Sequence, residues 1–122
     1  MNRVTPEQVL EAYKRTHLEP TNEMWFYISG DGRECGCALT AVAISQGKLY
    51  EDEIDSDFTS RDMAEALDLP VPYINGFTSG FTCSVYYNTY KDEVDHMYYK
   101  QGFEDGEKAW RTVAKYFFGS VV

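Results

Sequence analysis

The sequence contains three cysteines and two histidines, and Cys35 and His96 stand in the chain order of a nucleophile and its base. Cys35 lies in the segment Glu34-Cys35-Gly36-Cys37, directly before a run of small and apolar residues that is typical of a buried helix. A thiol in the first turn of a helix meets the positive end of the helix dipole, which lowers its pKa and favours the reactive thiolate. A histidine near such a thiolate can act as a general base.

The segment around Cys35 resembles the start of the catalytic helix in bacteriocin-processing peptidases, which are papain-like thiol hydrolases. The resemblance is confined to this short segment. It implies, as an alternative function, a thiol hydrolase with Cys35 as nucleophile, His96 as base, and Asp95 or Asp105 orienting the imidazole. In that family the histidine opens a hydrophobic strand, whereas His96 has charged neighbours, and no glutamine stands shortly before Cys35 to complete an oxyanion hole.

Two simpler or different roles remain open for the cysteines. Free cysteine often behaves as a small buried apolar residue, so these thiols can simply pack inside a helix. A zinc site would combine Cys35 and Cys37 with Cys83 and either His17 or His96. Structural zinc sites normally use two close pairs of ligands, and this chain has only one close pair, at an unusual spacing. We therefore expect neither a metal nor another cofactor.

The most acidic part of the chain is residues 51–57, where five of seven positions are carboxylates. An EF-hand loop needs glycine at its sixth position and glutamate at its twelfth. Counted from Asp55, these positions hold Ser60 and Ala66, so the segment does not match an EF-hand. We expect a solvated acidic loop.

Tyrosines are concentrated between residues 86 and 99, and Tyr86, Tyr87 and Tyr90 are the candidates for a recognition surface. Tyrosine is enriched at binding surfaces because it combines a large apolar ring with a polar tip. Burial in an aromatic core is the simpler alternative. Because no complete set of catalytic groups is apparent, we expect a non-enzymatic binding or regulatory protein whose partner is another protein.

The formal net charge of −9 bears on the choice of partner. Nucleic acids and anionic membranes would repel such a chain, so we expect neither to be its main partner. A basic protein or a cation is compatible with this charge, as is a simple role in solubility. No segment has the length and apolar character of a signal peptide or a membrane span, and an odd number of cysteines does not suit a disulfide framework. We expect a cytoplasmic protein.

A repeated glycine motif must position these residues. Gly76-Phe77-Thr78-Ser79-Gly80 and Gly102-Phe103-Glu104-Asp105-Gly106 share the pattern Gly-Phe-x-x-Gly, and Tyr73 and Tyr99 stand three residues before each first glycine. Glycines four residues apart share one helix face and allow another backbone to approach closely. We expect the two motif helices, or one of them and the small-residue helix, to cross at close distance. The same glycine face could instead pair between subunits, and the sequence leaves the oligomeric state open.

The remaining signals predict a mainly α-helical, single globular domain over residues 1–122. Caps and apolar spacing predict four helices, at residues 5–17, 35–46, 61–69 and 91–118, with Gly102 as a possible break in the last. Residues 72–84 fit a helix ending near Phe81, although a strand over residues 82–87 is an alternative. A minor two-stranded element could join residues 25–28 with 85–87. We expect helix 35–46 to form the core, with Trp25, Phe77, Phe103 and Trp110 packed around it.

Overall fold

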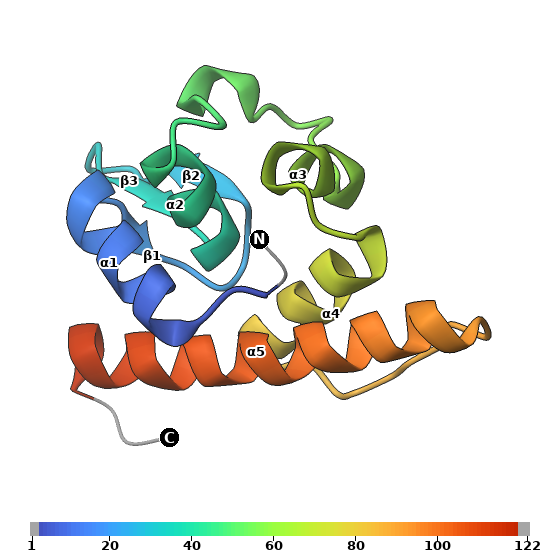
Figure 1. Ribbon diagram of the computed structural model, residues 1–122. Coiled ribbons are helices and arrows are strands. Elements are labelled where there is room, and N and C mark those ends of the chain that lie inside the picture. The colour runs from blue at the N-terminus through green and yellow to red at the C-terminus, as the bar shows by residue number, and fades with distance from the viewer. Residues whose placement is uncertain (1–2, 120–122) are drawn as a thin grey trace.

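The computed structural model describes residues 3–119 and confirms a mainly helical fold. Five α-helices and a small three-stranded sheet form within these residues (Figure 1). In chain order the elements are α1 (Pro6–Thr16), β1 (Glu19–Pro20), β2 (Phe26–Ile28), β3 (Glu34–Gly36), α2 (Ala38–Ser45), the 3₁₀ helix η1 (Glu51–Glu53), α3 (Ser60–Leu67), α4 (Val71–Phe81) and α5 (Glu93–Phe118).

Local signals in the sequence set the ends of these helices. Thr5 caps α1 through a reciprocal pair of hydrogen bonds with Gln8, and Pro6 occupies the first turn. Thr59 caps α3, which begins at Ser60, and Asp92 caps α5 by accepting from two backbone amides. The predicted helix ending near Phe81 is confirmed as α4, and α5 continues through Gly102 without a break.

The sheet corrects two predictions. Cys35 lies in the central strand β3, where it faces Glu19 of the parallel strand β1 and Tyr27 of the antiparallel strand β2. The predicted helix 35–46 therefore begins only at Ala38, because the backbone of the residues before it is hydrogen-bonded within the sheet. The predicted pairing of residues 25–28 with 85–87 is also wrong: β2 pairs with β3, and residues 85–87 form no strand.

Helix α2 lies at the centre of the core, as the sequence predicts. All its residues from Ala38 to Ala43 are buried, and the helix packs against α1 and α3. Phe77 of α4 joins this core, and Trp25 and Trp110 pack against it. Phe103 does not belong to this core; it lies with Tyr99 against the segment that links α4 to α5.

The two glycine motifs pair with one another across α4 and α5. A Cβ atom added to Gly76 would lie 2.1 Å from the carbonyl oxygen of Tyr99, and one added to Gly102 would lie 2.2 Å from that of Tyr73. Gly80 and Gly106 make the corresponding approaches to Phe103 and Phe77. The close crossing predicted for the two motif helices is confirmed, and the contacts advance in the same direction along both helices. The two helices are therefore parallel.

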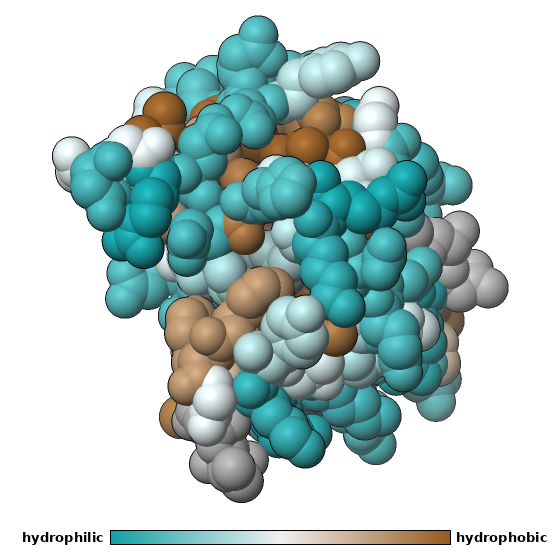
Figure 2. Space-filling view, turned by 90° about the vertical axis from the view of Figure 1, so that its left-hand side faces the viewer, coloured by the Kyte–Doolittle hydropathy of each residue, from teal (hydrophilic) through white to brown (hydrophobic). Residues whose placement is uncertain are grey.

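Helix α5 runs along one side of the molecule and contacts both α4 and α1 (Figure 1). Its N-terminal half packs against α4, while its C-terminal end meets α1 through an edge-to-face contact of Phe117 with Tyr13, their ring centroids 5.7 Å apart. Figure 2 shows an apolar patch on the face beside this C-terminal end. Among the described residues, no helix has the combination of length and apolar character that crossing a membrane requires.

Candidate functional site

The parallel arrangement of α4 and α5 determines the course of the chain between them. The link must return from the end of α4 to the start of α5, and it runs as an irregular segment beside the two helices (Figure 1). We call residues 82–92 the strap. It leaves α4 through a left-handed turn at Cys83, whose φ is 60°, and the amide of Ser84 donates to the carbonyl of Ser79 at 2.9 Å.

Two tyrosines hold the strap on the helices. The ring of Tyr86 meets Phe103 edge-to-face, with centroids 5.0 Å apart, and lies 5.8 Å from the ring of Tyr99. Tyr90 also lies 5.8 Å from Tyr99, and its hydroxyl oxygen accepts a hydrogen bond of 2.8 Å from the side chain of Asn75 in α4. These contacts bury Tyr99 and Phe103 beneath the strap.

Polar contacts close the far end of the strap onto α5. The side-chain amide of Asn88 donates to the carbonyl of His96 at 2.9 Å and to the hydroxyl oxygen of Tyr86 at 3.1 Å. The Nδ1 atom of His96 lies 3.1 Å from the carbonyl oxygen of Tyr90. Because a carbonyl only accepts, this nitrogen must carry the proton and donate. His96 therefore serves to fix the strap.

The outward side of the strap is apolar and exposed. Val85 is 86% exposed and Tyr87 is 73% exposed, whereas Tyr86 between them is 43% exposed. Val85 and Tyr87 therefore face solvent, whereas the ring of Tyr86 between them packs against α5. Of the three predicted binding tyrosines, Tyr87 points outward, Tyr86 is shared between the surface and α5, and Tyr90 is half-buried as an anchor.

The surroundings of the strap carry negative charge. Residues 82–107 contain six carboxylates and two lysines. Asp105 is buried and ion-paired with Arg3, while Asp92, Glu93 and Glu104 are exposed. A partner that docks on the strap therefore meets an apolar strip with acidic side chains at its C-terminal end.

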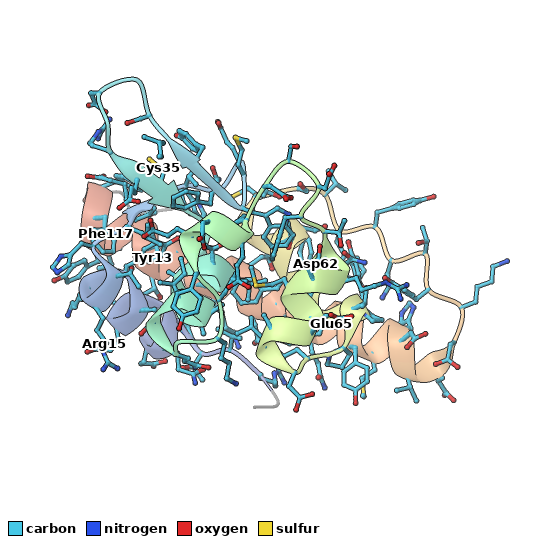
Figure 3. All side chains as sticks on the ribbon, turned by 90° about the horizontal axis from the view of Figure 1, so that it is seen from above. Tyr13, Arg15, Cys35, Asp62, Glu65 and Phe117 are labelled. Carbon is cyan, nitrogen blue, oxygen red and sulfur yellow. The ribbon has the colours of Figure 1, made fainter. Side chains whose placement is uncertain are left out.

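The structure places Cys35 and His96 at opposite ends of α5. Cys35 is buried in β3, next to Gly36, whose carbonyl accepts a hydrogen bond of 2.8 Å from the Tyr13 hydroxyl. Tyr13 in turn contacts Phe117, and Figure 3 shows these labelled side chains on one side of the molecule. His96 lies 21 residues before Phe117 on the same helix, which corresponds to about 30 Å along its axis.

The geometry thus does not bring the predicted nucleophile and base together. The expected place of Cys35 in the first turn of a helix is wrong, because that turn begins at Ala38. Asp105, one of the two residues predicted to orient the base, is instead bonded to Arg3 and Tyr73.

The acidic segment and α3 together line a surface cavity of about 450 Å³. Glu53, Asp55 and Asp57 come from the predicted acidic loop, whereas Asp62 and Glu65 come from α3, where Figure 3 labels them. Asp62 and Glu65 were not among the predicted site residues, although α3 begins only three residues after Asp57. Within residues 3–119, no three carboxylate, thiol or imidazole groups are grouped so that they could hold one metal ion.

Comparison of the chain with protein-family models, with curated proteins and with solved structures found no match in any of the three.

Proposed function

We propose that this protein is a non-enzymatic binding protein and that it recognises a basic segment of another protein through its strap. The exposure of Val85 and Tyr87 on a segment whose other side is anchored is the observation that carries this proposal. Large apolar side chains displayed together on a surface are typical of interaction sites.

The anchoring of the strap favours binding. A flexible loop loses conformational freedom when a partner docks, and this loss weakens the complex. Tyr86 and Tyr90 already hold the strap against α5, and Asn88 fixes it to the first turns of that helix. The ring of Tyr87 is therefore presented on a chain that is ordered before the partner arrives.

Charge supports a basic partner. The chain has a net charge of −9, and exposed carboxylates stand at the end of the strap, at Asp92, and directly after it, at Glu93. A guanidinium group can stack on a tyrosine face while its N–H groups pair with nearby carboxylates. A segment containing arginines meets both requirements of this surface.

A direct test uses a fluorescein-labelled peptide of alternating arginine and glycine, with binding followed by fluorescence anisotropy at low and at physiological salt. We expect saturable binding that weakens as salt is added. Tyr87→Ala should weaken binding about tenfold, which corresponds to about 1.4 kcal/mol. Tyr50→Ala is the matched control, because Tyr50 is 67% exposed but lies beside the acidic helix η1.

The two variants separate recognition by the strap from simple charge attraction. If binding depends only on the acidic surface, Tyr87→Ala and Tyr50→Ala will leave it equally unchanged. That result, or the absence of saturable binding by the unmodified protein, would contradict the proposal.

A further inference from the structure

A second site lies away from the exposed side of the strap, between α2, α4 and the chain that enters β2. It is a cavity of about 160 Å³. Its walls are mainly apolar and include Trp25, Leu39, Phe77 and Phe81. The ring of Trp25 makes an edge-to-face contact with the ring of Phe58, with centroids 5.6 Å apart. The walls of the cavity are therefore formed by residues that pack against the rest of the protein.

The hydroxyl and thiol groups in the cavity wall already have partners within the protein. The hydroxyl of Thr78 donates to the carbonyl of Ile74 at 2.9 Å, and that of Thr82 donates to the carbonyl of Ser79 at 3.1 Å. The sulfur of Cys37 lies 3.4 Å from the hydroxyl oxygen of Thr40. Burial raises the pKa of the Cys37 thiol, which favours its uncharged form. These three groups therefore offer no charge to a ligand.

We propose that this cavity binds a small, uncharged molecule with a single six-membered ring. An apolar cavity of about 150 Å³ is large enough to bind benzene, so a volume of about 160 Å³ suits one ring. An anionic ligand is disfavoured because the lining residues include the carboxylate of Glu23 and no cationic side chain. Met24, which is 55% exposed, also lines the cavity, and its flexible side chain can adjust to admit the ligand.

Ligand size and charge provide the first test. The melting temperature is measured with increasing benzene, naphthalene and benzoate. We expect benzene to raise it in a concentration-dependent way, since a ligand that binds the folded state stabilises it. Naphthalene should have a smaller effect, and benzoate should have none. Equal effects of all three compounds, or no effect of benzene, would overturn the proposal.

The thiol of Cys37 reports occupancy directly. In a Cys83→Ser variant, which lacks the exposed thiol, modification of Cys37 by methyl methanethiosulfonate is followed by mass spectrometry. Saturating benzene should slow this modification about tenfold, given the closeness of the thiol to the cavity. An unchanged rate would contradict binding at this place, even if benzene stabilised the protein elsewhere.

A variant that fills the cavity completes the test. Thr78→Leu adds volume to the wall, and we expect it to abolish the effects of benzene on both the melting temperature and Cys37. Thr112→Leu makes the same substitution on α5, away from the cavity lining, and should leave both effects intact. If Thr78→Leu retains the full response, the ligand does not occupy this cavity.

Discussion

The hydroxyl group of Tyr73 donates a hydrogen bond of 2.6 Å to the buried carboxylate of Asp105, which joins α4 to α5 beside their glycine contacts. Arg3 binds the same carboxylate with two nitrogen atoms, each 2.9 Å from an oxygen. The backbone amide of Val4 donates to the Tyr73 hydroxyl oxygen at 2.7 Å. One tyrosine thus connects the start of the described chain to both motif helices, and Arg3 compensates the charge of Asp105.

The two tyrosines of the repeated motif have different tasks. Tyr73 and Phe77 face the core, whereas Tyr99 and Phe103 face the strap. The same local pattern therefore builds the interior on one side of the helix pair and supports the candidate binding surface on the other.

Replacing the Tyr73 hydroxyl should lower stability. Tyr73→Phe leaves the amide of Val4 without its partner and removes one hydrogen bond from Asp105, which should cost about 1–3 kcal/mol of unfolding free energy. Urea denaturation measures this change. Tyr87→Phe removes an exposed hydroxyl and should stay within about 0.5 kcal/mol of the unmodified protein. Equal stabilities of the two variants would show that the buried network contributes nothing.

Stability should fall at alkaline pH. Burial, and the hydrogen bond to Asp105, raise the pKa of Tyr73 well above its ordinary value of 10.0, and burial likewise raises the pKa of Tyr13. Above pH 10 the unfolded chain loses protons that the folded protein retains, so the unfolded state gains stability. The stability that the raised pKa of Tyr73 contributes is fully present below pH 10, and it is lost as the pH rises towards the pKa of the folded state. Urea denaturation from pH 8 to 11 should show the fall, and a shallower slope in Tyr73→Phe; an unchanged slope would count against this assignment.

The glycine crossing should not tolerate a methyl group. Gly76→Ala would place Cβ 2.1 Å from the carbonyl oxygen of Tyr99, and we expect a loss of about 3 kcal/mol or more, or failure to fold. Alanine is the better helix former by about 1 kcal/mol, so helix propensity alone predicts that Gly76→Ala stabilises the protein. Gly30→Ala, at a position with no atom nearby, should change little. A stabilised Gly76→Ala variant would rule out the close crossing.

The three thiols should react in a defined order. Cys83 is exposed, Cys37 is half-buried with a raised pKa, and Cys35 is buried. Iodoacetamide near neutral pH should therefore modify Cys83 first, as peptide mass spectrometry can show. The alternative function as a thiol hydrolase makes the contrary prediction, namely that Cys35 reacts fastest.

The helices were predictable because their signals are local. Thr5 and Pro6 start α1 by their own chemistry, and the paired glycines require a close backbone approach wherever they occur on a helix. The sheet was not predictable in the same way. Cys35 is held by pairing with two strands from other parts of the chain, and strands of two or three residues carry no detectable periodicity.

The candidate binding surface was predictable only in part. Composition pointed to Tyr86, Tyr87 and Tyr90 without distinguishing anchors from exposed side chains. That distinction depends on the strap lying against Tyr99 and Phe103, which in turn follows from the parallel packing of α4 and α5.

Locating the arginine–glycine peptide on the protein tests the proposed function most directly. A titration followed in ¹H–¹⁵N NMR spectra reports every backbone amide separately. We predict saturable shifts in residues 84–88 and in the neighbouring residues of α5, with little change at Asp55, Asp62 and Glu65 in the acidic cavity. Shifts confined to the acidic cavity would show that the peptide follows charge alone, and they would contradict recognition through the strap.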